Sequence, residues 1–74
     1  MKCTVKLIWD DEAQVWITES PDIPGLFLES ESFDMLIKKV NQAAPELLSL
    51  NNQYNGPIFV NFEAERITAI PLVS

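Results

Sequence analysis

The N-terminal segment alternates between apolar and mostly polar residues. Its apolar side is formed by Cys3, Val5, Leu7 and Trp9. A period of two residues is typical of a β-strand with one side in a core. After a polar segment at 10–13, residues 14–19 alternate again, with Val15 and Ile17 on one side and Trp16 on the other. We therefore expect a β-hairpin in which Val15 and Ile17 face the core and Trp16 faces away from it.

Residues 20–25 interrupt this pattern most strongly. Pro21 and Pro24 fix φ and lack an N–H group. Gly25 permits backbone angles that most residues avoid. These features predict a rigid loop through which no sheet ladder runs. Residues 26–29 are then predicted to form a short third strand.

An amphipathic helix is predicted after this strand. Ser32 is suited to cap its N-terminus, and Asp34 in the first turn suits the positive end of the helix dipole. Apolar residues recur at steps of three and four positions, at Phe33, Leu36, Ile37, Val40, Ala44, Leu47 and Leu48. Pro45 interrupts this stripe, and inside a helix it removes one backbone hydrogen bond. We expect either a kink there or a break followed by a second short helix.

Two extended segments complete the chain. Residues 58–63 alternate again and predict a fourth strand. Residues 66–73 form a further extended stretch that contains Pro71, a residue confined to sheet edges or bulges. This stretch is apolar enough to need covering. Two alternatives are open: it pairs with the chain's own sheet edge, or with the edge of a neighbouring molecule.

These elements predict one domain of the α+β class over residues 1–74. The expected fold is an antiparallel β-sheet in the order β-β-β-α-β, with one face covered by the helix and the C-terminal stretch as an optional extra strand. A single helix leaves the other sheet face open, and the alternation places several large apolar residues there. Exposed apolar patches mark interaction sites. The predicted interface residues are Ile8, Trp16, Phe27, Phe59, Ile67, Ile70 and Leu72.

The size and composition favour self-association. A domain of 74 residues leaves much of its surface exposed and has a small core, which disulfides, metals or oligomerisation usually reinforce. The single cysteine, Cys3, excludes an intrachain disulfide, and the absence of histidine leaves no ligand set for a zinc site. A homo-oligomer, dimeric or higher, is the expectation that remains.

The charge and hydropathy of the chain narrow its partners. Eleven acidic residues and five basic ones give a net charge of −6, which argues against direct nucleic-acid binding because phosphates attract clustered Lys and Arg. An acidic surface suits a basic protein partner, although charge also maintains solubility. No apolar run is long enough for a membrane span, and no hydrophobic signal-peptide region follows Met1. Together with the lone cysteine, these features predict a cytoplasmic protein without a membrane partner.

The reactive side chains have ordinary structural explanations. The carboxylates considered for catalysis or metal binding are Asp10, Asp11, Glu12, Asp22, Glu29, Glu31 and Asp34. They fall in a turn, in the proline loop, or at or near the start of the helix, where acids are common. Cys3 lies on the core side of its strand and is expected to act as a small apolar residue. The chain has no phosphate loop, dinucleotide motif or metal-ligand spacing, so we expect no cofactor, no metal site and no catalytic residue.

The segment 15–26 resembles the signature of HicB-like antitoxin domains. In that family, a strand with an aromatic residue leads into a Pro-Asp-hydrophobic-Pro-Gly loop, which a short strand and a long helix follow. Trp16 matches the aromatic position, and the loop matches at Pro21, Asp22, Ile23, Pro24 and Gly25. The resemblance extends through the fourth strand. It implies a reduced ribonuclease-H-like fold that assembles as dimers or higher oligomers and blocks a small basic RNA-cleaving toxin.

A typical HicB antitoxin continues into a DNA-binding domain, which this sequence lacks up to Ser74. The chain therefore looks closer to the short single-domain bacterial proteins of unknown function that share the HicB-like fold, and operator binding is not expected. Two interpretations of the loop at 21–25 are open. It is either a structural corner or part of the rim of an interface.

We therefore expect a non-catalytic protein-interaction domain that self-associates and, on the family resemblance, binds a small basic toxin. Two alternatives belong to other functional classes. One is a metal-dependent nuclease or hydrolase that uses clustered carboxylates, which the implied ribonuclease-H-like fold suggests. The other is a small-ligand binding domain with a pocket beside Trp16 and the proline loop.

Overall fold

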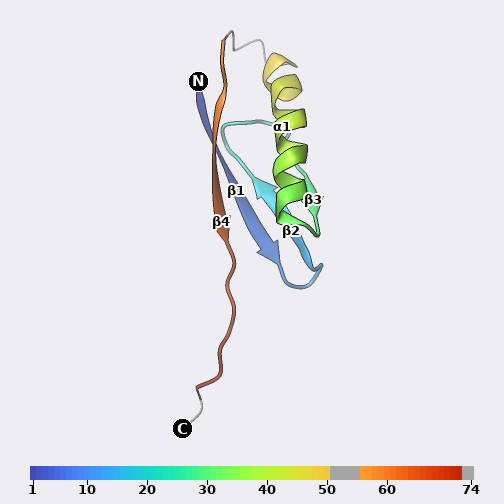
Figure 1. The fold of residues 1–74 in the computed structure, drawn as a ribbon, viewed down its shortest axis with the longest axis vertical. Coiled ribbons are helices and arrows are strands. Elements are labelled where there is room, and N and C mark those ends of the chain that lie inside the picture. Colours follow the sequence, from blue (N-terminus) through green and yellow to red (C-terminus); the bar gives the residue numbers. More distant parts are fainter. Residues whose placement is uncertain (51–55, 73–74) are drawn as a thin grey trace.

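The computed structural model describes residues 1–50 and 56–72, and it shows one sheet with one helix packed on it (Figure 1). The elements are β1 (Lys2–Asp10), β2 (Val15–Glu19), β3 (Glu29–Ser30), α1 (Phe33–Leu50) and β4 (Phe59–Glu65). The predicted α+β class and element order are confirmed. The optional C-terminal strand is not observed, because residues 66–72 are not part of the sheet. Its last residue, 73, lies outside the described residues.

The sheet is mixed, with the strand order β3-β2-β1-β4. The pairs β1–β2 and β2–β3 are antiparallel, as predicted, whereas β4 runs parallel to β1. The expectation of a wholly antiparallel sheet is therefore wrong for this one pair. The physical reason is the helical connection: α1 carries the chain back along the sheet after β3, so β4 runs in the same direction as β3 and hence as β1 (Figure 1).

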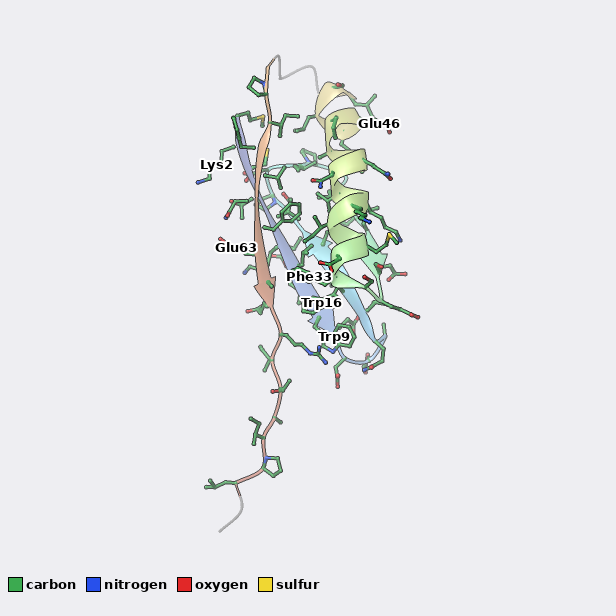
Figure 2. The ribbon with its side chains drawn as sticks, viewed as in Figure 1. Lys2, Trp9, Trp16, Phe33, Glu46 and Glu63 are labelled. Atoms are coloured by element: carbon green, nitrogen blue, oxygen red, sulfur yellow. The ribbon has the colours of Figure 1, made fainter. Side chains whose placement is uncertain are left out.

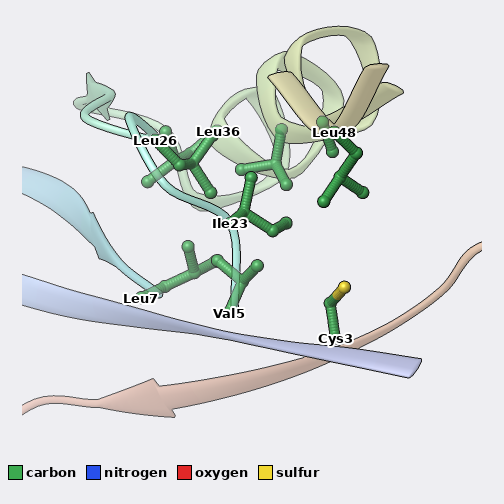
Figure 3. Packing of buried hydrophobic residues seen from close by; sticks show 9 residues of the cluster. Cys3, Val5, Leu7, Ile23, Leu26, Leu36 and Leu48 are labelled. Carbon is green, nitrogen blue, oxygen red and sulfur yellow. The ribbon is translucent and has the colours of Figure 1, made fainter. Parts of the chain in front are cut away.

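The core lies between β1 and α1. Cys3, Val5 and Leu7 have no exposed surface, as the alternation of β1 predicts. The helix contributes its buried residues Leu36, Val40, Ala44 and Leu48. Two residues from the loop before β3, Ile23 and Leu26, complete this cluster (Figure 3). The first three apolar side chains that β1 directs towards the helix are thus removed from water.

Local interactions explain both the start of α1 and the proline inside it. The N–H group of Met35 donates to Oγ of Ser32 at 3.2 Å, so the predicted N-cap is confirmed. Pro45 lies inside α1, which runs unbroken to Leu50. The predicted break is therefore wrong. Because Pro45 and Asn41 are both exposed, water can bind the Asn41 carbonyl group that loses its helical partner at the proline.

The proline loop completes the hydrogen bonding of β1. Strand β2 pairs only with the second half of β1, from Lys6 onwards. Beyond that point, the N–H group of Thr4 donates to Oδ2 of Asp22 at 2.8 Å, and Oγ of Ser20 donates to the Thr4 carbonyl at 2.7 Å. Ile23 inserts into the core with 1% of its surface exposed. The loop therefore acts as a structural corner. Its second interpretation, as part of the rim of an interface, stays a prediction.

A substitution at Gly25 tests how strongly this loop is constrained. Gly25 has a φ of +85°, and a Cβ atom there would lie 3.4 Å from Cδ2 of Leu47. We expect Gly25→Ala to lower the free energy of unfolding by about 1–2 kcal/mol, because L-residues other than Asn and Asp rarely adopt this conformation. Gly25→Asn is the matched control and should cost clearly less. Urea denaturation of the three proteins measures the effect, and equal stability of the Ala and Asn variants would contradict backbone strain as its cause.

Candidate functional site

The hairpin register decides which side chains face the helix. Trp16 is paired with Trp9, and Ile17 with Ile8. Paired residues on neighbouring strands share a sheet face, so Trp16 lies on the helix-covered side together with Trp9. The prediction that Trp16 lies on the open face is therefore wrong, whereas the placement of Ile8 there agrees with the structure.

The facing of β2 is inverted because a polar residue takes a core position. Thr18 has only 8% of its surface exposed. Its hydroxyl donates to the Leu26 carbonyl at 3.2 Å and accepts from the N–H group of Leu28 at 3.0 Å. These bonds satisfy the buried hydroxyl, and Val15 and Ile17 consequently face outwards. Both sides of β2 carry apolar residues, so its sequence alone specifies the facing weakly.

An aromatic cluster occupies the end of the sheet where α1 begins. The ring centroids of Trp9 and Trp16 are 5.4 Å apart, and those of Trp16 and Phe33 are 5.0 Å apart, both in edge-on geometry (Figure 2). Cζ of Arg66 lies 4.4 Å from the Trp9 ring centroid, a distance at which a cation–π interaction is favourable. The cluster connects the hairpin, the helix start and the residue that follows β4.

The sequence did not reveal the role of Arg66. The two partners are far apart in the chain, and Arg66 reaches Trp9 because Glu65 pairs with Ile8 in the parallel β1–β4 ladder. The sequence predicts an antiparallel sheet and no pairing of the first and fourth strands, so it does not bring Arg66 and Trp9 together. A single arginine directly after a strand was the only local signal.

We define the open face as the sheet side turned away from α1. Its side chains are Lys2, Thr4, Lys6, Ile8 and Asp10 of β1, Val15, Ile17 and Glu19 of β2, Glu29 of β3, Phe59, Asn61, Glu63 and Glu65 of β4, and Phe27 before β3. Ile8 and Ile17 lie directly opposite each other and are half-buried. Phe27 and Phe59 are 87% and 64% exposed. The predicted positions of these two phenylalanines on the open face agree with the structure.

Charged residues surround these apolar side chains. By register, Lys6 lies between Glu19 on β2 and Glu63 on β4. Two more carboxylates, Glu29 and Glu65, lie beside Ile17 and Ile8. Figure 2 shows Glu63 on the side of the sheet away from α1. The open face therefore combines exposed apolar side chains with an excess of negative charge.

Two shallow hollows lie beside Phe27. One has a volume of about 390 Å³ and is lined by Ile17, Thr18, Phe27, Leu28 and Glu29. The other, of about 440 Å³, is lined by Phe27, by the end of β2 and by most of the proline loop. Trp16 lines neither hollow. The small-ligand alternative expects a pocket beside Trp16 and the proline loop. The loop does line a hollow, but Trp16 does not.

The C-terminal arm, which we define as residues 66–72, projects beyond the sheet (Figure 1). It makes the molecule 57 Å long, against 19 and 17 Å in the other two directions. The exposed fractions of Ile67, Ile70 and Leu72 are 82%, 87% and 99%. The arm does not pair with the chain's own sheet edge. Of the two alternatives for this stretch, pairing within the chain is therefore not observed.

The remaining candidates serve the fold. Oδ1 of Asp10 accepts the N–H groups of Glu12 and Ala13 in the hairpin turn. Within residues 1–50 and 56–72, no three His, Cys, Asp or Glu side chains are grouped so that they could hold a metal ion. Cys3 is fully buried. Burial raises the pKa of its thiol above the ordinary value, and the negative charge of Asp22 raises it further.

The fold and these surfaces define a small α+β domain with exposed apolar side chains on one sheet face and in a terminal arm. The chain belongs to the family described as a domain of unknown function, DUF1902, whose match spans residues 2–74. It is also similar to a solved structure, a hypothetical protein from the extremely thermophilic bacterium Thermus thermophilus. The two chains are 35% identical, the TM-score is 0.82, and the match covers 95% of this chain and 100% of that one.

Two further findings complete the comparison. No curated protein matches the chain. In the part of the chain that the structure describes, α1 is too short or too polar to cross a membrane.

The buried thiol predicts a loss of stability at alkaline pH. Because the pKa of Cys3 is raised in the folded protein, the stabilisation is complete below the ordinary value of 9.0 and is lost as the pH rises through the folded value. Above about pH 9, the wild type should lose stability as the pH rises, by at most about 1.4 kcal/mol per pH unit from this one group. Urea denaturation at several pH values measures the slope.

Cys3→Ala is the control for this slope. It is less stable overall because it leaves a small cavity, but its stability should change less with pH, since all other titrating groups are shared. Parallel pH profiles of the two proteins would contradict a raised thiol pKa.

Proposed function

We propose that this chain is a non-catalytic protein-interaction domain that self-associates. The observation that supports the proposal is the exposure of large apolar side chains, which is 64% or more at Phe27, Phe59, Ile67, Ile70 and Leu72. Soluble monomers seldom expose contiguous apolar patches beyond a few hundred Å². These residues occur on the open face and in the C-terminal arm, where nothing else in the described residues covers them.

The small core gives self-association an energetic reason. Among residues 1–50 and 56–72, the buried apolar cluster has nine members, two of which are the small residues Cys3 and Ala44. Burying one further Ile, Leu or Phe side chain contributes about 1.5–3 kcal/mol. A domain of this size is marginally stable, so a few such side chains buried between copies would add a large fraction of its stability. The single buried thiol also favours a reducing cytoplasm as the place of action.

A finer proposal concerns the partner: a small basic protein, as in HicB-like antitoxins. Two observations support it. The loop at 21–25 matches the HicB-like signature, and the open face carries more carboxylates than ammonium groups around its apolar residues. In a chain of net charge −6, such a face would attract a basic partner electrostatically and then offer it apolar contacts.

The self-association proposal predicts the mass of the protein in solution. One chain has a mass of 8.4 kDa. Size-exclusion chromatography with light scattering should give at least twice that mass at about 100 µM and a lower mass on dilution, because association follows mass action. Phe27→Ser and Phe59→Ser test the open face separately. A constant mass of one chain up to about 1 mM would contradict the proposal.

The partner proposal predicts charge-dependent binding. The probe is the product of any short reading frame adjacent to this gene that encodes a basic protein, co-expressed with the chain. A gene neighbourhood without such a reading frame would contradict the proposal. We expect co-purification that weakens as the salt concentration rises. The double variant Glu19→Lys with Glu63→Lys should bind with an affinity at least about tenfold lower than that of the wild type. Glu12→Lys, which changes the same type of charge in the hairpin turn, should have little effect. Equal weakening by the turn and face variants would overturn the assignment to the open face.

A further inference from the structure

The outer side of β4 is an unused sheet edge. The N–H group of Phe59 donates to the Met1 carbonyl at 2.8 Å, towards β1. Successive N–H groups of a strand alternate in direction, so those of Val60, Phe62 and Ala64 point to the other side. In residues 1–50 and 56–72, no strand pairs with that side, because β4 ends the sheet. A free edge of this kind is a template for a further strand.

The C-terminal arm has the properties of the missing strand. It follows β4 directly and continues in its direction (Figure 1). Its backbone is extended, and its large side chains are almost fully exposed. An arm that continues straight on from its own β4 cannot fold back onto that edge without a turn. The edge of a second molecule is within its reach.

We propose that the C-terminal arm of one copy adds as an antiparallel strand to the outer edge of β4 in a second copy. This inference rests on the proposed self-association and names the surface that performs it. Edge and arm are consecutive parts of one segment, so a two-fold axis places each arm on the other copy's edge. Such an isologous contact closes as a dimer and leaves neither β4 edge free.

Side-chain packing supports this arrangement. Val60 and Phe62 of β4, and Ile58 just before it, face the core but are only half-buried. The backbone of α1 lies closest to β2 and β3. Arg66 points to the same side, since it contacts Trp9. Alternation then places Ile70 and Leu72 on that side too. Docked beside β4 of the partner, these two side chains would cover its half-buried Val60 and Phe62.

The charge of the arm and its fixed starting point also support the arm of a second copy as the strand that pairs with the outer edge of β4. The arm contains one charged residue, Arg66, and no carboxylate, whereas the β4 edge carries Glu63 and Glu65. An arm without negative charge thus meets an acidic edge. The contact of Arg66 with Trp9 fixes where the arm leaves the sheet, which reduces the conformational freedom lost on docking. Pro71 is compatible because the arm itself forms an edge.

Hydrogen exchange measured by NMR tests the pairing in the full chain. In the dimer, the amides of Val60, Phe62 and Ala64 should exchange at least about tenfold more slowly than at concentrations where the protein is monomeric. The amides that already bond to β1 serve as the internal reference, because their protection should change less. Unprotected amides at these three positions in a dimeric protein would overturn the proposal.

Arm variants provide the second measurement. Ile70→Asp combined with Leu72→Asp should raise the dimer Kd by about 100-fold or more, since each change acts twice in a symmetric dimer. The fold should be unaffected, because both side chains are almost fully exposed, and far-ultraviolet circular dichroism verifies this. Met35→Asp, on the outer side of the first helical turn, is the matched control and should leave the Kd unchanged.

The outcomes separate this inference from the proposed function. A wild type that is dimeric, with an unchanged Kd in the arm variant, refutes the arm pairing and leaves self-association through another surface. A wild type that is monomeric at all concentrations refutes both. A dimer that is lost in the arm variant and kept in Met35→Asp, with protected β4 amides, supports the arm as the connecting strand.

Discussion

The structure depends on β1, an inner strand of the sheet whose one side is fully buried in the core. Its residues Cys3, Val5 and Leu7 form the floor of the core, and β2 and β4 both take their register from it. Where β2 does not reach, the proline loop satisfies Thr4 through Asp22 and Ser20. A buried strand must satisfy all its backbone groups, and this requirement places the hairpin, the loop and the last strand.

A domain with one helix can cover only one side of such a sheet. The sheet side that α1 covers is buried in the core. The surfaces available for function are therefore the open face, the sheet edges and the C-terminal arm. The open face combines Phe27 and Phe59 with an excess of carboxylates, whereas the arm is apolar and carries a single positive charge. The two surfaces therefore differ in charge, and the proposed self-association draws on the apolar side chains of both.

The family match and the solved relative show that other proteins share this fold. The match to DUF1902 spans nearly all residues and includes the proline loop, the open face and the arm. The Thermus thermophilus protein is similar over its entire length. The aromatic cluster around Arg66 shows how such a fold holds its terminal segment in place: a cation–π contact spans the distance from β1 to the residue after β4.

The sequence by itself determined the elements whose signal is local. The alternation in β1 and the three- and four-residue steps in α1 are strong because one side of each is apolar and the other polar, and the Ser32 cap depends only on residues of the first turn. Where both sides are apolar, as in β2, the pattern is ambiguous, and the facing that it predicts for Trp16 is wrong. Only the tertiary structure decided that Thr18 is buried, that β4 runs parallel to β1, that Pro45 lies within a continuous helix and that Arg66 meets Trp9. Each of these depends on long-range pairing or on solvent exposure, which a residue's neighbours in the chain do not encode.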